Sequence, residues 1–193
     1  MPTMTRTIPI ALTIVVALSA CGSSADTSAS AEPTPTPTTA STNAPATTEA
    51  SPTGETAPEV PQTLDFTART IDGDTFTGAS LAGKPTVFWF WAAWCPTCRG
   101  SAEAVAAVQQ DNADRVNVVG VAGLGSGDDA MLRFAQDTGI QGFPQLADDA
   151  GEVWQRFEVV SQQYYVLLDS AGKVVHKGSF SDSDLRERVA ELT

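Results

Sequence analysis

The feature that most constrains this fold is a continuous apolar and aromatic run that leads into two cysteines three residues apart. The run is Thr86–Trp91, with the sequence TVFWFW, and the cysteines are Cys95 and Cys98. A short run without polar alternation is typical of a central strand that is buried on both faces of a sheet. Small apolar residues at helical spacing follow as far as Gln110, so we expect a helix that begins at Cys95. This strand–turn–helix unit predicts an α/β domain.

The segments on either side of this unit predict the rest of a mixed sheet. Alternating apolar and polar residues predict a strand over Leu64–Arg69, and a second apolar run predicts a buried strand over Val116–Val121. Turn and capping signals predict the other elements. We expect a return strand at Thr75–Thr77, a flexible loop at Gly123–Gly127, and a helix that Asp128 or Asp129 caps and that runs to Asp137, with a stop at Gly139. After that helix we expect a loop or short strand at Pro144–Asp149, a short helix at Gly151–Phe157, a hairpin of Tyr164–Leu168 with Lys173–His176, and a final helix from Ser181 to Leu192. This order predicts a mixed central sheet with helices on both sides.

The charge balance excludes two classes of partner. The 193 residues include 23 Asp and Glu but 11 Lys and Arg, which gives a net charge of −12. Nucleic acids and anionic membrane surfaces are both bound through clustered basic side chains. Since the sequence has no such cluster, we expect no nucleic acid as a partner and no membrane binding by charge alone.

The N-terminus has the pattern of an export signal. Residues 8–20 are almost wholly apolar, but their length of roughly 13 is too short for a membrane-spanning helix, which needs about 20. The tetrapeptide LSAC at 18–21 resembles the lipobox of bacterial lipoproteins. The resemblance implies a lipoprotein signal peptide over residues 1–20 and lipidation of Cys21. The alternative is an ordinary signal peptide that is cleaved nearby and leaves Cys21 as a free thiol.

Residues 21–61 join this signal to the rest of the chain. After the cysteine they are rich in Ser, Thr, Ala and Pro, with a few acidic residues and no aromatic residue, Lys or Arg. Such a segment buries too little apolar surface to offset its conformational entropy. We therefore expect a disordered linker that lifts a folded domain, over residues 62–193, away from a membrane.

The cysteine pair at the start of a helix is typical of thiol–disulfide chemistry. Backbone N–H groups and the helix dipole stabilise an anion at a helix N-terminus, so the first thiol is the better nucleophile. We expect Cys95 to form the mixed disulfide and Cys98 to resolve it, with a Cys95–Cys98 disulfide as the redox-active bond. Pro96 suits an early helical position because its missing N–H costs nothing there. Pro96 and Thr97 lie between the cysteines and modulate the reduction potential.

Two other uses of this pair stay open from the residues alone. One is a structural disulfide, and the other is a zinc site. Structural zinc usually takes four ligands, whereas the folded domain has two cysteines and one histidine, His176, so we expect no metal. We expect His176 at an edge strand, Trp89 and Trp91 in the core, and Trp94 exposed beside the pair as a substrate contact.

The motif FWAAWCPTCR at 90–99 resembles the active site of the thioredoxin superfamily, and within it the extracytoplasmic TlpA/ResA/DsbE branch, including actinobacterial DsbE-like proteins. The lead-in LAGKP at 81–85 and the turn LDSAGKV at 168–174 are also similar to that branch. The resemblance covers nearly all of residues 62–193. It implies a thioredoxin fold with an N-terminal extension strand or hairpin, a dithiol/disulfide activity, and no bound cofactor.

Three residues depart from the pattern that the resemblance implies. Gln163 stands opposite the cysteines, where the superfamily has a cis-proline. That proline normally shapes the substrate groove. A cis bond before any other residue costs about 2.5–4 kcal/mol, so we expect Gln163 to be trans or strained. Trp89 replaces a buried Asp of thioredoxins, and Ser101 replaces a Glu of reductive members. The last two changes weaken the case for a strong reductase.

Together these features predict a lipid-anchored thiol–disulfide oxidoreductase on the extracytoplasmic face of the cell membrane. It would act on thiols or disulfides of exported proteins, with a bias towards oxidation, and a membrane redox partner would recycle it. One alternative is a reductase that supports cytochrome c maturation. The other is a non-catalytic, thioredoxin-like binding lipoprotein, for which the Gln163 departure is the main support.

Overall fold

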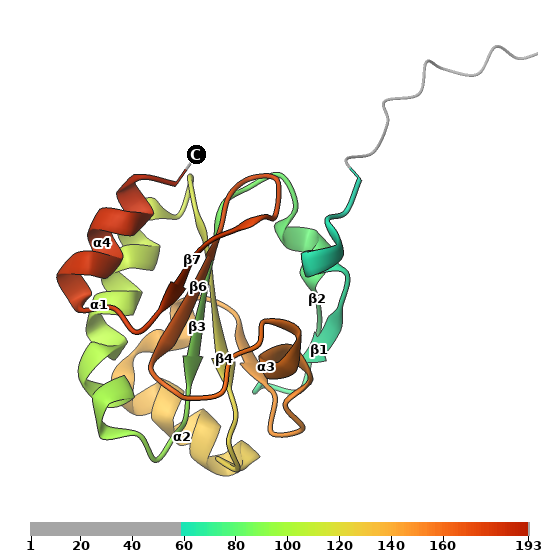
Figure 1. The fold of residues 1–193 in the computed structure, drawn as a ribbon. Coiled ribbons are helices and arrows are strands. Elements are labelled where there is room, and N and C mark those ends of the chain that lie inside the picture. Colours follow the sequence, from blue (N-terminus) through green and yellow to red (C-terminus); the bar gives the residue numbers. More distant parts are fainter. Residues whose placement is uncertain (1–58, 193) are drawn as a thin grey trace, which may run out of the picture. The chain divides into compact units, whose positions relative to one another are not determined.

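The computed structural model describes residues 59–192 of the chain (Figure 1). The predicted signal peptide, Cys21 and almost all of the predicted linker lie outside the described residues. Among the helices that are described, none is both long and apolar enough to cross a membrane.

The domain is built on a five-stranded sheet with the order β5-β4-β3-β6-β7. Strand β3 (Thr86–Trp91) lies in the middle, parallel to β4 (Asn117–Ala122) and antiparallel to β6 (Tyr164–Leu168). Strand β5 (Gln145–Ala147) pairs in parallel with β4, and β7 (Val174–Gly178) pairs antiparallel with β6. All six residues of β3 are buried, which confirms the prediction of a central strand.

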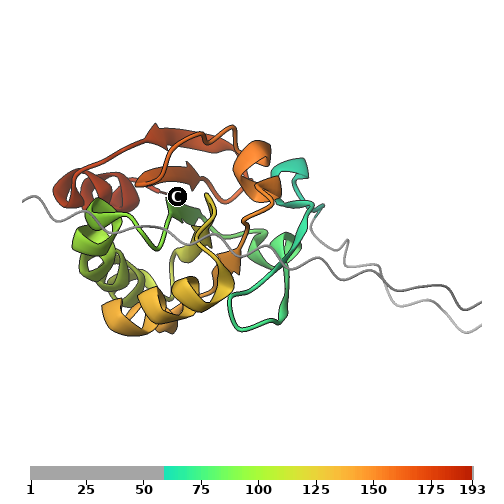
Figure 2. The ribbon, with the colours of Figure 1, turned by 90° about the horizontal axis from the view of Figure 1, so that it is seen from below.

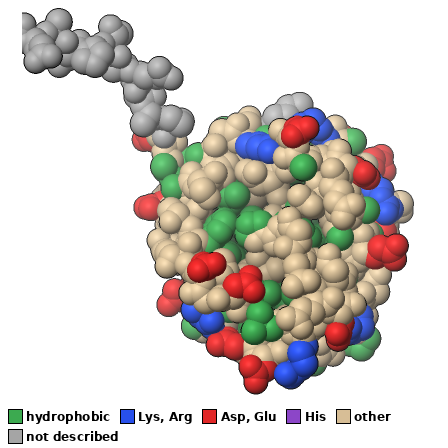
Figure 3. All heavy atoms as spheres, turned by 180° about the vertical axis from the view of Figure 1, so that it is seen from behind, with side chains coloured by type: hydrophobic (Ala, Val, Ile, Leu, Met, Phe, Trp, Pro, Cys, Tyr) green, Lys and Arg blue, Asp and Glu red, His purple; other side chains and the backbone are tan. Residues whose placement is uncertain are grey.

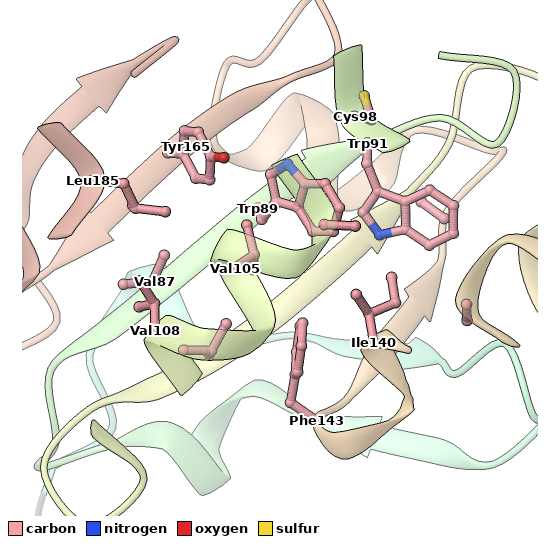
Figure 4. Close-up of a cluster of buried hydrophobic side chains, with 14 of the residues drawn as sticks. Val87, Trp89, Trp91, Cys98, Val105, Val108, Ile140, Phe143, Tyr165 and Leu185 are labelled. Atoms are coloured by element: carbon pink, nitrogen blue, oxygen red, sulfur yellow. The ribbon is translucent and has the colours of Figure 1, made fainter. Parts of the chain in front are cut away.

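Side chains of β3 alternate between two separate halves of the core. Val87, Trp89 and Trp91 pack in one hydrophobic cluster, and Phe88 and Phe90 pack in the other. This alternation follows from the pleat of a strand, which points successive side chains to opposite faces. Figure 4 shows Trp89 and Trp91 side by side within the first cluster.

Helices cover both faces of the sheet (Figures 1 and 2). On the face of the first cluster lie α1 (Pro96–Asn112), α2 (Asp128–Thr138) and α4 (Asp182–Ala190). The other face carries α3 (Glu152–Arg156), whose Val153 and Trp154 pack with Phe88 and Phe90. The predicted mixed sheet between helices is therefore confirmed.

The N-terminal part of the domain is a short hairpin that completes the second face. Strands β1 (Thr67–Arg69) and β2 (Thr75–Thr77) pair antiparallel, and the 3-10 helices Gln62–Leu64 and Gly78–Leu81 flank them. The prediction of a strand from Leu64 is wrong at its start, because successive i→i+3 backbone bonds from Pro61 and Gln62 wind these residues into a helical turn. The buried Leu64 side chain still contributes to the second cluster.

Three helix ends show how local sequence sets the boundaries. The prediction that Asp128 or Asp129 caps α2 is wrong, because Gly127 occupies the cap and Asp128 lies inside the helix, 2.6 Å from Arg69. Gly139 ends α2 as predicted, with a φ of 71° that glycine adopts without steric cost. Helix α4 begins after Ser181, whose hydroxyl accepts the N–H of Asp184.

The surface carries charges of both signs without a basic patch on the face that Figure 3 shows. Lys and Arg side chains there are scattered among Asp and Glu. This distribution agrees with the acidic net charge and offers no phosphate-binding surface on that face.

Candidate active site

The two cysteines lie at the junction of β3 and α1. Cys95 caps the helix, and its sulfur accepts a hydrogen bond of 3.0 Å from the Cys98 N–H. The N–H of Cys95 in turn donates to the carbonyl of Ala92 at 3.1 Å, which closes the turn after the strand. Pro96 is the first helical residue, as predicted. The two sulfurs form a disulfide, with the Cα atoms 5.3 Å apart.

The two cysteines differ only slightly in exposure. Cys98 is fully buried, and Cys95 is 3% exposed. The cause is the capping position, since the Cys95 sulfur turns back over the first turn of α1 towards the Cys98 N–H. Pro96 and Thr97, between them, are exposed on the first turn. An approaching thiolate therefore meets Cys95 before Cys98.

Trp94 is exposed beside the disulfide, as predicted, with 55% of its surface open. Its indole N–H donates to the carbonyl of Leu124 at 3.1 Å, in the loop between β4 and α2. Leu124 is itself exposed and adopts a left-handed φ of 59°. Leu124 could not be found from the sequence, because no local signal marks the contact with a residue 30 positions away.

The loop Gly123–Gly127 is tied down rather than flexible, which corrects the prediction. The Ser126 hydroxyl accepts the N–H of Ala93 at 2.9 Å and donates to the carbonyl of Gly123 at 2.6 Å. The carboxylate of Asp149 accepts the N–H groups of Ser126 and Gly127 at 3.0 and 2.8 Å. This loop thus joins the cysteine-bearing turn to the segment after β5.

Gln163 is buried at the entry to β6 and binds three side chains. Its Oε1 accepts the indole N–H of Trp89 at 3.1 Å. Its Nε2 donates to the Ser101 hydroxyl at 2.9 Å and to the Tyr165 hydroxyl at 3.1 Å. The three residues that depart from the thioredoxin pattern are therefore hydrogen-bonded to one another. Gln163 has a φ of 54°, a left-handed conformation that costs a residue with a side chain about 1 kcal/mol or more.

Trp91 has a similar glutamine partner, which comes from β5 on the β4 side of the sheet. The Oε1 of Gln145 accepts the Trp91 indole N–H at 3.1 Å, and its Nε2 donates to the carbonyl of Ile140 at 2.8 Å. Gly120 leaves the space that this side chain fills, since a Cβ there would overlap Gln145. Trp91 also stacks on Phe134 with centroids 4.4 Å apart.

Two buried groups have shifted acidities. Burial raises the pKa of Tyr165 to about 12, because the charged phenolate is poorly solvated there. Burial also raises the pKa of Asp148, against the opposing effect of the backbone N–H groups of Glu152, Val153 and Trp154 that its carboxylate accepts. Asp148 holds the start of α3, whereas Tyr165 belongs to the Gln163 cluster.

His176 lies on the edge strand β7, as predicted, and is half-buried. Its Nδ1 is 3.0 Å from Nη1 of Arg188 on α4, so the guanidinium donates to the ring. Within residues 59–192 the structure brings together no group of three His, Cys, Asp or Glu side chains that suits a metal ion.

A disulfide at the N-terminus of a helix, after the central strand of this mixed sheet, defines a thioredoxin-like thiol–disulfide oxidoreductase. The comparison with known families agrees. The chain belongs to the AhpC/TSA family, which matches residues 54–177.

Individual relatives support the same class. The soluble secreted antigen MPT53 of Mycobacterium tuberculosis is 37% identical over 134 residues, which cover 67% of this chain and 76% of the relative. The solved structure of MTB DsbF is 44% identical, with a TM-score of 0.65, and covers 70% of this chain and 100% of that one. A secreted M. tuberculosis disulfide oxidoreductase homologous to E. coli DsbE is 35% identical, with a TM-score of 0.62, over 68% of this chain and 98% of that one.

These findings confirm the predicted resemblance, the thioredoxin fold and the enzyme class. They also agree with the class of partner, since thiol–disulfide oxidoreductases act on protein thiols. The predicted site residues Trp94, Cys95 and Cys98 lie together at the start of α1, and Gln163 bonds to Ser101 one helical turn after Cys98. The structure adds Leu124, Ser126 and Tyr165 through their hydrogen bonds to Trp94, Ala93 and Gln163.

Proposed function

We propose that this protein exchanges disulfides with exported proteins through the Cys95–Cys98 pair, with Cys95 as the nucleophile and Cys98 as the resolving residue. The observation that carries the proposal is the hydrogen bond of 3.0 Å from the Cys98 N–H to the Cys95 sulfur at the first turn of α1. When Cys95 is released as a thiolate, this donor and the helix N-terminus stabilise its charge.

In the oxidising direction, a substrate thiolate attacks the sulfur of Cys95. The Cys95–Cys98 bond breaks, Cys98 leaves with the electron pair and takes up a proton, and a substrate–Cys95 disulfide forms. A second substrate thiolate then attacks the substrate sulfur and releases Cys95 as a thiolate. The substrate loses two electrons and the protein gains two. In the reducing direction the same steps run in reverse.

We favour the oxidising direction. Exported compartments favour disulfides, and Trp89 and Ser101 stand where reductive relatives would carry acidic groups. The alternative is a reductase, such as one that keeps the haem-site thiols of cytochrome c reduced. A measured reduction potential of about −120 mV would exclude the reductase, and one of about −270 mV would exclude the oxidase.

The activity itself is tested with scrambled ribonuclease and insulin on the wild type and Cys95→Ser. We expect exchange by the wild type alone, because the variant has no disulfide and no nucleophile at position 95. Equal rates in both proteins would reject the catalytic role of Cys95 and favour a non-catalytic binding protein. Cys98→Ser, which leaves mixed disulfides unresolved, should accumulate exported proteins attached to Cys95 and identify the substrates and the membrane partner that recycles the pair.

The proposed location is the extracytoplasmic face of the membrane, with residues 1–20 as a lipoprotein signal peptide, Cys21 lipidated and residues 21–61 as a linker to the domain at 62–193. The LSAC sequence at 18–21 and a relative named as secreted support this proposal. Metabolic labelling with palmitate should mark the wild type but not Cys21→Ala. Equal labelling of both proteins would exclude lipidation at Cys21.

A further inference from the structure

We propose that Gln163 is a positioning residue that holds the loop between α3 and β6 in place to receive a cysteine-containing polypeptide at the disulfide. The inference rests on the proposed exchange with protein substrates and adds the residue that selects them. Gln163 is the buried polar side chain that joins β3, α1 and β6, through Trp89, Ser101 and Tyr165.

The hydrogen bonds of Gln163 place this loop next to the cysteines. Ser101 follows Cys98 by three residues on α1, so the two side chains share one face of the helix about one turn apart. The bond of 2.9 Å from Gln163 to the Ser101 hydroxyl therefore fixes the end of the loop one helical turn from the resolving cysteine. Figure 4 shows Tyr165 beside Trp89, its partner across β3 and β6, and Cys98 on α1.

The loop is held in a strained form. Glu158 and Gln163, near its two ends, have left-handed φ values of 55° and 54°. Such conformations persist in residues with side chains only where the surroundings determine them. Glu158 is exposed, whereas the side chain of Gln163 is 9% exposed and fully hydrogen-bonded. The Gln163 amide is therefore the group that holds this end of the loop.

The chemistry of the loop fits a polypeptide rather than a small thiol. Val160, between these two residues, is 90% exposed, and Trp94 is exposed beside Cys95. Large apolar side chains exposed on this loop and beside Cys95 favour contact with an extended, partly apolar chain. A small dithiol needs only the disulfide itself and gains nothing from the loop.

The hydrogen-bond acceptor and donors of the Gln163 amide match the groups that its three partners offer. Trp89 offers only a donor, so it needs the carbonyl oxygen, and both hydrogens of the amide nitrogen are used by the two hydroxyls. Alanine at 163 removes all three bonds and frees the loop. Alanine at 101 removes one bond and leaves the other two.

The test compares two reductants of the oxidised protein, an unfolded peptide of about ten residues with two thiols and dithiothreitol. For Gln163→Ala we expect the second-order rate constant with the peptide to fall about tenfold to a hundredfold, as for a misplaced substrate, with the dithiothreitol rate within about twofold of wild type. Ser101→Ala should show a smaller loss with the same selectivity for the peptide.

Gln145→Ala is the matched control, because it also breaks a buried glutamine–tryptophan bond, to Trp91, but lies away from the loop. It should leave both rate constants within about twofold of wild type while lowering stability by a similar amount. If Gln163→Ala does not fold, Ser101→Ala against Gln145→Ala decides the question.

An equal fall in the Gln163→Ala rate constants with both reductants, or no fall with either, would overturn the positioning role. A wild-type protein whose disulfide reacts with dithiothreitol but not with thiol peptides would instead refute the proposed function. The two failures are therefore distinguishable.

Discussion

Reducing the disulfide should increase the free energy of unfolding at pH 9, where a free cysteine is mostly ionised, although it removes a covalent link. The reason lies in the position of Cys95 at the cap of α1, where the thiolate of the reduced form accepts the Cys98 N–H. The disulfide sulfur accepts the same bond without a charge and so more weakly. The thiolate has no comparable donor in the unfolded chain.

The stabilising effects of the disulfide and of the thiolate nearly cancel, so the form that is more stable reveals how strongly the thiolate is stabilised. A disulfide that closes a loop of four residues stabilises the oxidised form by about 2 kcal/mol through the entropy of the unfolded chain. A charge-assisted hydrogen bond contributes about 1.5–3 kcal/mol, and the helix N-terminus adds about 0.3–1 kcal/mol. The reduced form should thus be more stable by about 1 kcal/mol. That difference raises the reduction potential by about 20 mV above that of the unfolded chain.

The assay is urea unfolding of the oxidised and the dithiothreitol-reduced protein, followed by tryptophan fluorescence. Trp89, Trp91 and Trp154 are all buried and report the transition. Acidification that protonates Cys95 in the reduced protein should abolish its advantage and leave the oxidised form more stable. An oxidised protein that is still more stable at pH 9 would refute the stabilised thiolate, and with it the bias towards oxidation.

Three further predictions concern other parts of the domain. Because folding raises the pKa of Tyr165 from 10.0 to about 12, its contribution to stability is complete below pH 10 and is lost as the pH rises from 10 to 12, by up to about 2.7 kcal/mol. Urea titrations should show this loss in the wild type and not in Tyr165→Phe. Gly120→Ala should cost about 1–3 kcal/mol in the same assay, because its Cβ would overlap Gln145. Gly100→Ala, with open space on α1, should be neutral or stabilise by up to about 1 kcal/mol. Trp94→Ala should leave the stability within about 0.5 kcal/mol, since the side chain is mostly exposed, and should lower the exchange rate with peptides more than with dithiothreitol.

The parts of the fold that depend on local pattern could be predicted from the sequence. The run Thr86–Trp91 has no polar residue after its first position, and its short length and aromatic content are typical of a strand buried on both faces. Pro96 and the cysteine before it mark a helix start because the missing N–H is harmless there. Gly139 and Ser181 mark a helix end and a helix start for equally local reasons.

The parts that depend on distant residues could not be predicted. The bond between Trp89 and Gln163 spans 74 positions, and the bond between Trp91 and Gln145 spans 54. Nothing within either neighbourhood of the sequence shows that an indole there needs an acceptor from another element. Leu124 was missed for the same reason, since its role comes from a backbone carbonyl that Trp94 reaches across two loops.

The departures at Trp89, Ser101 and Gln163 form one structural unit rather than three separate losses. The buried indole N–H of Trp89 requires an acceptor, which is the carbonyl oxygen of the Gln163 side chain. The amide nitrogen of Gln163 donates its hydrogens to the hydroxyls of Ser101 and Tyr165. Proline would fix φ near −65°, so it cannot replace Gln163 at 54° unless the loop rebuilds.

Each of these residues is therefore explained by the others, and the change at position 163 no longer supports a protein that has lost its activity. All four side chains in the cluster are uncharged near neutral pH, so its hydrogen bonds do not depend on protonation there. We therefore expect the proposed positioning role of Gln163 to be independent of pH near neutrality, because no group in the cluster changes its charge there.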